Sequence, residues 1–256
     1  MIMEPWRSPP VNIVTPTGWD ESPQASDTKP KRHRPTTPTS PPTTMRQWVA
    51  FDTTMLDAWI TCDVEVVVSF LEDIRRGNSA QRRRKLVGLD TEWKSLPGGD
   101  VTTAILQLCV GTSVLVFQVL YANGGDLPKV LKGFLTEEDN IFTGAHIEND
   151  VKRLWDDFSV TITNPIDLQL VVPEAAAEYK HLGGSHPEYG PWCSSLEKIA
   201  SEVLCLPHHH KPAGADHDHW HERYLDSFQV RYAAIDAYLS YEIANQLELK
   251  HGYRFA

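Results

Sequence analysis

The sequence has few cysteines, and they are far apart. Four occur among 256 residues, and none stands in a C-x-x-C pair. Disulfide-rich domains and cysteine-based zinc sites depend on cysteines that are numerous or closely spaced. The pattern therefore argues against both, and we interpret the four as reduced, mostly buried thiols: Cys62, Cys109, Cys193 and Cys205.

Long hydrophobic runs are also missing. The longest apolar stretches, such as residues 64–71, are interrupted by polar side chains and fall short of the roughly 18 residues that a membrane span needs. The N-terminus lacks the basic-then-apolar order of a secretory signal, and its acidic residues argue against an organelle transit peptide. We therefore expect no membrane partner and a nuclear or cytoplasmic location.

Positive charge is in the minority. The chain has 24 Lys and Arg against 34 Asp and Glu, a formal net charge of −10. This balance excludes a surface that is basic throughout. One local cluster, Lys-Pro-Lys-Arg-His-Arg-Pro at residues 29–35, is of the kind read by nuclear import. It favours the nucleus, with the cytoplasm as the alternative.

Proline is concentrated at one end of the chain. Ten of the eighteen prolines precede residue 46, among serines and threonines without hydrophobic periodicity. Such a composition cannot bury enough apolar surface to fold. The sequence predicts a disordered tail over residues 1–45 and one folded domain over residues 46–256.

Hydrophobic periodicity after the tail predicts an α/β domain. Short strand-like runs come first, and longer amphipathic runs follow. Antiparallel strands followed by a strand–helix part predict a mixed central sheet with helices on both faces. The expected strands are 48–51, 58–61, 85–93, 104–109, 114–117 and 141–143, and the expected helices are 66–74, 127–135, 147–158, 167–177, 195–204 and 229–249.

Two acids stand two residues apart inside an apolar strand. In Val-Gly-Leu-Asp-Thr-Glu-Trp, residues 87–93, the side chains of Asp90 and Glu92 point to the same face. Two like charges there raise the energy unless a cation lies between them. A solvated edge strand is the alternative, although the apolar residues before Asp90 favour a central strand.

Two later segments carry further acids. Asp150 lies in the first turns of an amphipathic helix, where acids are also ordinary capping groups. Tyr232 and Asp236 stand one turn apart on the last helix, with small residues between them. Such spacers allow other groups to approach closely.

The ordered set Asp90-x-Glu92, Asp150 and Tyr232-x-x-x-Asp236 resembles the DEDDy branch of the 3′-5′ exonucleases, most of all its Werner-type domains, including those of plants. The resemblance covers roughly residues 46–252. It implies an RNase H-like exonuclease fold and hydrolysis of nucleic acid, with DNA favoured, from a free 3′ end. The segments that carry it are 87–93, 106–109, 147–152 and 232–238.

The resemblance also implies a cofactor and residue roles. Two ions, Mg²⁺ or Mn²⁺, would be held by carboxylate oxygens, which suit hard cations. Asp90 would bridge both ions. Glu92 and Asp236 would complete the site of the ion that activates water, and Asp150 would hold the second ion. Tyr232 would orient the water, because a phenol that titrates near pH 10 is a poor base at neutral pH.

Contacts to nucleic acid are expected close to these acids. Trp93 could stack on a terminal base or pack on the sheet. Lys152, Arg153 and the basic run 82–85 could bind backbone phosphates or face water. We predict Trp93, Lys152 and Arg153 as nucleic-acid-binding residues. The sequence contains no helicase P-loop, so we expect any unwinding to come from a separate helicase.

One loop departs from the family pattern. Six of the eleven histidines fall within residues 208–221, where relatives carry a lysine-containing loop. We expect adventitious metal binding or none there, since the loop lacks the ordered partners of a zinc site, together with an effect on substrate handling. His146 likewise replaces the glycine that is usual before Asp150, and the sequence assigns it no role.

Two rival functions stay open at the level of sequence. An RNA-trimming exonuclease of the RNase D kind has the same catalytic set, and ribose contacts are not readable here. A non-catalytic nucleic-acid-binding or partner-binding module could keep the fold, although it has no need for clustered buried acids. No surface pattern in the sequence indicates an oligomeric state.

Overall fold

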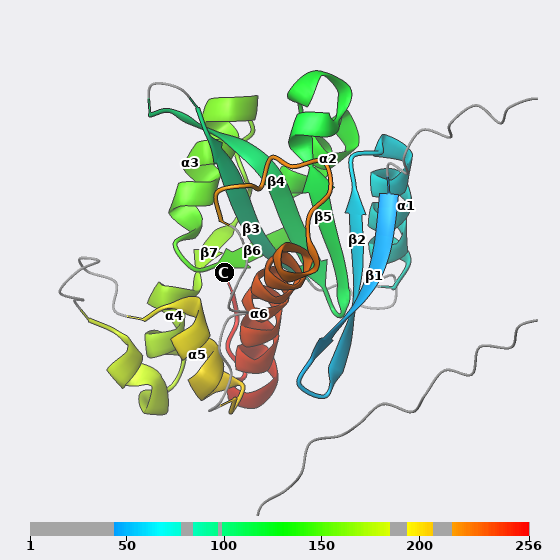
Figure 1. Cartoon of the computed structure of the whole chain (residues 1–256). Helices are drawn as coiled ribbons and strands as arrows, with labels where there is room; N and C mark the ends of the chain where they lie inside the picture. Colours follow the sequence, from blue (N-terminus) through cyan, green and yellow to red (C-terminus); the bar gives the residue numbers. More distant parts are fainter. Residues whose placement is uncertain (1–43, 78–83, 97–98, 185–193, 207–216, 256) are drawn as a thin grey trace, which may run out of the picture. The chain divides into compact units, whose positions relative to one another are not determined.

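A seven-stranded sheet forms the centre of the structure, in the order β1-β2-β5-β4-β3-β6-β7 (Figure 1). The strands are β1 Thr44–Phe51, β2 Thr54–Thr61, β3 Lys85–Ser95, β4 Val101–Val110, β5 Ser113–Gln118, β6 Asn140–Gly144 and β7 Pro165–Asp167. The helices are α1 Val64–Gly77, α2 Lys129–Leu135, α3 Ile147–Phe158, α4 Leu168–Ala175, α5 Leu196–Val203 and α6 Ser227–His251, with 3₁₀ turns η1 Val119–Tyr121, η2 Asn123–Gly125 and η3 Ala177–Leu182.

This computed structural model describes residues 44–77, 84–96, 99–184, 194–206 and 217–255. All of them belong to one unit that spans residues 41–256. Three predictions fall wholly or mostly outside these ranges: the tail, the basic cluster at 29–35 and the first part of the histidine-rich loop. None of the described helices has the length and hydrophobicity to cross a membrane.

The sheet is mixed, as the sequence predicts. Three neighbouring pairs are antiparallel, β1 with β2, β4 with β5, and β3 with β4. Three are parallel, β2 with β5, β3 with β6, and β6 with β7. Every expected strand is present, and each is longer than expected, β1, β2 and β4 by four residues, because ladder hydrogen bonds continue beyond the residues that carry the hydrophobic pattern.

Two expectations need correction. The helix expected over 167–177 is shorter, because Asp167 ends β7 and caps α4 by accepting a hydrogen bond from Gln169 N, and Ala176 has an extended backbone. Strand β7, only three residues long, was not expected at all.

Among the cysteines, Cys62 and Cys109 are buried free thiols as expected, whereas Cys205 is exposed. Cys193 lies outside the described residues.

Helices cover both faces of the sheet. Side chains from α4, α5 and α6 share one hydrophobic core with alternate strand residues such as Leu86 and Ile105. Side chains from α1, α2 and α3 share a second core with the intervening residues, such as Val87 and Leu106. This alternation follows from the two-residue period of a strand, which sends neighbouring side chains to opposite faces.

Gly88 allows helix α6 to approach the sheet closely. Helix α6 packs across β3, β4 and β5 and lies in front of the sheet in Figure 1. A Cβ atom at Gly88 would lie 2.0 Å from the carbonyl oxygen of Ala237 and 2.6 Å from the backbone nitrogen of Tyr241. Only glycine leaves room for this contact. It brings the turn of α6 that carries Asp236 against β3, two residues before Asp90.

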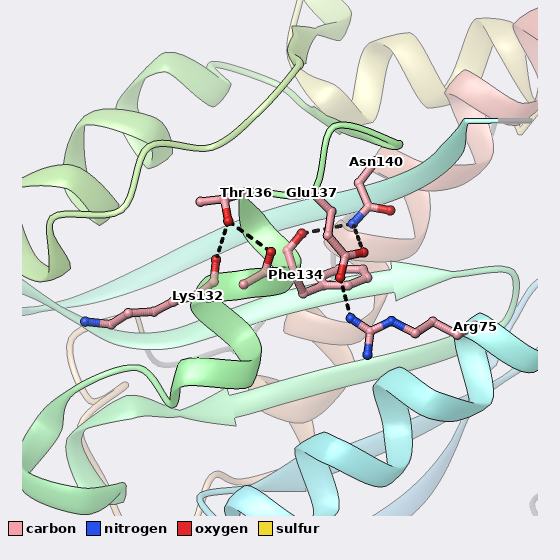
Figure 2. A network of polar contacts seen from close by, with 7 residues as sticks. Arg75, Lys132, Phe134, Thr136, Glu137 and Asn140 are labelled. Atoms are coloured by element: carbon pink, nitrogen blue, oxygen red, sulfur yellow. Dashed lines mark hydrogen bonds and ion pairs between the residues drawn. The ribbon is translucent and has the colours of Figure 1, made fainter.

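A polar network fixes the connection between α2 and β6 (Figure 2). The side-chain amide of Asn140 donates to the carbonyl of Phe134 at 2.9 Å and to Glu137 Oε2 at 3.3 Å. Arg75 on α1 forms an ion pair with the same glutamate. Because Asn140 is the first residue of β6, this network sets where β6 enters the sheet and therefore where α3 begins.

Candidate active site

The two acids of β3 lie inside the sheet. Strand β3 is flanked by β4 and β6, with Asp90 opposite Gln107 of β4 and Glu92 opposite Ile105. Glu92 is buried and Asp90 is half-buried. The alternative of a solvated edge strand is therefore wrong. The pairing of β3 with β6 ends at Gly88, so the edge of β3 beside both acids is open to another element.

Asp150 of α3 occupies that edge. The Thr91 hydroxyl donates a hydrogen bond to Asp150 Oδ1 at 2.5 Å, and Thr91 is the residue between Asp90 and Glu92. Asp150 is only 5% exposed. The structure thus brings the acid of α3 to the strand that carries the other two, which spacing in the sequence does not determine.

The environment of Asp150 raises the pKa of its carboxyl group. Burial is the main cause and raises the pKa of Asp150 to about 7. Hydrogen bonds from the hydroxyl and backbone N–H of Thr91 act in the opposite direction, and the charge of nearby Asp167 raises the pKa further. Burial likewise raises the pKa of Asp167. Two buried acids with raised pKa values mark an electrostatically costly region of the kind found at functional sites.

Helix α6 supplies the remaining two residues. It begins with a capping box, in which the Asp226 side chain accepts from the Gln229 backbone and the Gln229 side chain accepts from the Asp226 N–H. One turn later Tyr232 is buried, and Asp236, 3% exposed, directly precedes Ala237, whose carbonyl lies at the Gly88 contact. Ala233 and Ala234, which lie between Tyr232 and Asp236, have small side chains and let this turn approach neighbouring elements closely.

The carboxylates have suitable donor chemistry for a metal ion, but they are not gathered around one point. Oxygen donors suit Mg²⁺ and Mn²⁺, and the side chains come from three elements that meet at β3. Within the described residues, however, no three His, Cys, Asp or Glu side chains are close enough to hold one ion. Holding an ion therefore requires the carboxylates to turn toward a shared point.

A buried amide lies next to the carboxylates. Gln107 is fully buried opposite Asp90, and neither its Oε1 nor its Nε2 forms a hydrogen bond within the described structure. Leaving both groups of a buried amide unsatisfied is costly, so such positions are usually completed by water or a ligand. The region beside Asp90 therefore has polar groups available for a bound species, in agreement with the donor chemistry of the acids.

The three predicted nucleic-acid contacts do not lie together. The Arg153 guanidinium stacks on the Trp93 ring, 5.4 Å from its centre, and Arg153 Nη1 donates to the Val101 carbonyl at 3.0 Å. A register shift between Glu92 and Trp93 accompanies this arrangement. These contacts hold α3 against the β3–β4 hairpin, so both side chains have structural partners. Their contact with nucleic acid stays a prediction.

Lys152 instead lines a cavity of about 500 Å³ beside α3. Its other walls include the exposed Trp155 of α3, the exposed Leu170 of α4 and the buried Asp167. Sequence reasoning missed this cavity because its residues come from α3, β7 and α4 and share no motif. In the sequence, the only indication of a shared surface is that Lys152 and Trp155 stand three residues apart on a predicted helix and so lie on one face of it.

His146 begins helix α3 in a left-handed conformation, with φ of 57°. Residues with a Cβ adopt this conformation at some cost, whereas glycine would adopt it freely. Its Nε2 lies 3.1 Å from Gln169 Nε2, and the Gln169 amide donates to the Ser194 carbonyl at 2.6 Å. His146 therefore connects the start of α3 to α4 and to the segment before α5.

Comparisons with known proteins agree with this architecture. A family model described as 3′-5′ exonuclease matches residues 67–251. A mimivirus protein whose name points to the same activity is 29% identical over 197 residues, 76% of this chain and 46% of that protein. The 3′-5′ exonuclease of Arabidopsis thaliana is 25% identical over 168 residues, 63% of this chain and 52% of that protein. The chain thus spans about half the length of these curated relatives.

Solved structures share the fold. The EXO domain of Aedes aegypti Nibbler has a TM-score of 0.57 at 19% identity, covering 75% of this chain and 87% of that domain. Escherichia coli RNase D has a TM-score of 0.56 at 16% identity, covering 75% of this chain and 44% of that protein. These likenesses confirm the fold class predicted from the sequence.

Proposed function

The chain belongs to the 3′-5′ exonuclease family, and we propose that it hydrolyses nucleic acid from a free 3′ end with the help of divalent ions. One observation supports this most: Thr91, the residue between Asp90 and Glu92, binds the buried Asp150 directly. Helix α6 adds Asp236 where Gly88 lets it meet the same strand. A non-catalytic module has no reason to concentrate buried acids in this way.

In the proposed site the four carboxylates Asp90, Glu92, Asp150 and Asp236 would hold Mg²⁺ or Mn²⁺. Bound ions supply positive charge that offsets the phosphate charge and lowers the pKa of coordinated water. Tyr232 orients the water that attacks phosphorus. The new bond joins the water oxygen to phosphorus while the bond to the leaving 3′ oxygen breaks, and the leaving oxygen takes up a proton in exchange for the one that the water loses.

The substrate is proposed as DNA, on the basis of the Werner-type pattern in the sequence. RNA is the second candidate, because RNA-trimming exonucleases of the RNase D kind have the same catalytic set; the structural likeness to RNase D adds the fold alone. The experiment uses a 5′-labelled DNA duplex with a recessed 3′ end and an RNA strand of matched sequence, each with Mg²⁺, Mn²⁺ or EDTA. The ratio of the two rates then identifies the preferred substrate.

Asp90→Ala and Asp156→Ala form the matched pair for this assay. Asp156 is an exposed acid on α3 away from the four carboxylates. We expect ladders that shorten from the 3′ end, require a divalent ion, fall at least about a hundredfold in Asp90→Ala, and persist in Asp156→Ala. A folded wild type that binds these strands and degrades neither would support the non-catalytic module instead.

A nuclear location and a separate helicase partner complete the proposal. The location rests on the basic cluster at residues 29–35, which lies outside the described residues. A fluorescent fusion of the full chain, compared with one in which the four basic residues of that cluster (Lys29, Lys31, Arg32, Arg34) are replaced by alanine, tests it directly.

A further inference from the structure

The residues that lead into α6 are held firmly at the end of β5. We call residues 217–226 the lead-in segment; it is the orange stretch that crosses the upper part of the sheet in Figure 1. Gln118, the last residue of β5, donates through Nε2 to the carbonyls of Glu222 and Arg223, at 3.2 and 3.1 Å. The Tyr121 hydroxyl donates to the His221 carbonyl at 2.6 Å. Three backbone carbonyls of the lead-in segment are thus fixed by side chains of β5 and η1.

The fixed segment brings two rings against Tyr232. The His217 ring lies 4.8 Å from the Tyr232 ring, centre to centre, at an interplanar angle of 84°. The Trp220 ring lies 5.9 Å from Tyr232 and 6.0 Å from His217. Trp220, only 1% exposed, packs against Tyr232 from the inside of the protein. His217 is exposed and packs against Tyr232 from the solvent side. Edge-to-face geometry of this kind is attractive and directional.

We propose that His217 is a positioning residue for the reaction, which holds the Tyr232 ring in the orientation that directs its hydroxyl at the attacking water. This rests on the proposed function of Tyr232. A tyrosine hydroxyl is placed by two side-chain torsions, and a ring packed at 84° on its outer side restricts both. Loss of that restriction lets the hydroxyl sample unproductive positions, and small misplacements of this kind reduce turnover.

His217 belongs to the described end of the histidine-rich loop. Among its described residues, His219 and His221 stack on each other, with ring centres 5.7 Å apart. The edge-to-face contact with Tyr232 is made by His217. His219 and His221 serve as comparison positions for His217.

The test measures kcat and KM of the full chain on the preferred labelled strand. In His217→Ala we expect kcat to fall about two- to tenfold, the loss of one aromatic contact, with KM unchanged. His217→Phe restores kcat, since it returns a ring without a titratable nitrogen. His219→Ala leaves both constants unchanged. In a Tyr232→Phe background, His217→Ala has no further effect on kcat.

Three results would overturn the proposal. A loss of the same size in the Tyr232→Phe background means that His217 acts independently of the phenol. A rise in KM alone means that it binds substrate. A kcat equal to that of wild type means that the contact has no role. If wild type is no more active than Asp90→Ala, it is the proposed function that fails.

A second readout is independent of activity. The protein is labelled with isotopes in its tyrosine rings and measured by NMR. The ring signal of Tyr232 is assigned by its absence in Tyr232→Phe. We expect it to shift in His217→Ala and to stay in place in His219→Ala, since the His217 ring lies within 5 Å. Thermal unfolding of each variant separates this local effect from loss of the fold, and an unchanged signal contradicts the contact.

Discussion

The hydrogen bond from Thr91 to Asp150 joins the two parts of the candidate site. Both side chains are buried, at 4% and 5% exposure, and the acceptor is an acid. A hydrogen bond to a charged group stabilises a protein by about 1.5–3 kcal/mol, and its removal leaves the acceptor buried without that donor. At the scale of single residues, this contact and the charge of Asp150 control the local energetics.

Replacing Thr91 by valine removes the hydroxyl and keeps the shape. We expect Thr91→Val to lower the free energy of unfolding by about 1–3 kcal/mol at pH 8, where more of Asp150 is charged. Urea unfolding measures the difference. Thr53→Val, at an exposed turn position, should change the stability by less than about 0.5 kcal/mol. Equal effects of the two substitutions on the free energy of unfolding would show that the hydrogen bond from Thr91 to Asp150 does not stabilise the fold.

The raised pKa of Asp150 makes stability depend on pH. Its folded-state pKa of about 7 exceeds the ordinary value of 3.8, so the folded state binds this proton more tightly than the unfolded state. The stabilising contribution is complete below about pH 4 and is lost as the pH rises through 7.

We therefore expect Asp150→Asn to match the wild type near pH 4 and to unfold a few degrees higher at pH 8, measured by thermal unfolding in EDTA. Asp156→Asn, at an exposed position on the same helix, should reproduce the wild-type profile. A wild-type pH slope in Asp150→Asn would contradict the assignment. Asp167, whose pKa is also raised by burial, leaves a residual slope of the same sign.

At the scale of elements, the contact between α6 and β3 decides the site. Residues on every side of the N-terminal half of α6 are buried, including Val230, Ala234 and Leu239. A helix buried all round lies inside the protein rather than on its surface. Gly88 is the point at which this helix touches the catalytic strand, so the distance between the two elements depends on one missing Cβ.

Adding that Cβ should separate the elements. We expect Gly88→Ala to lower the free energy of unfolding by about 1–3 kcal/mol or more, because the new atom would lie 2.0 Å from a backbone oxygen, and to abolish most of the exonuclease activity. Gly133→Ala, in α2 with nothing within 4 Å of the new atom, should instead be stabilising by about 0.5–1 kcal/mol. Urea unfolding and the strand-degradation assay compare the two; an active, stable Gly88→Ala would contradict this account.

At the scale of the whole molecule, charge is the governing quantity. The chain has a net charge of −10, and its proposed substrate is a polyanion. The net negative charge of the protein therefore repels this substrate at long range. Divalent ions held by the carboxylates would reverse the local charge where phosphate binds, so binding of ions and binding of substrate are expected to depend on each other.

Ion binding should be visible without substrate. A ligand that binds only the folded state at about 100 times its Kd adds about 2.7 kcal/mol of stability, which raises the unfolding temperature by several degrees in a domain of this size. We expect Mn²⁺ or Mg²⁺ at millimolar concentration to produce such a rise in the wild type and in Asp156→Ala, but not in Asp90→Ala or Asp236→Asn. An equal rise in all four would place the bound ion elsewhere.

The sequence by itself determined the local structure and the family. Strand period placed Asp90 and Glu92 on one face, and helical period located α3 at residues 147–158 as the structure has it. The motif order predicted the exonuclease fold that the comparisons confirm. These features depend on residues close together in the chain, for which the spacing of side chains is a sufficient guide.

Only the tertiary structure decided which distant residues meet. It brought Asp150 into hydrogen-bonding distance of Thr91 and the Arg153 guanidinium over the Trp93 ring. It placed Lys152 in the wall of a cavity and the His217 ring against Tyr232. It also added β7, whose three residues are too few for a periodic signal. Each of these contacts depends on how elements dock against the sheet, and docking is set by the packing of whole faces rather than by any local pattern.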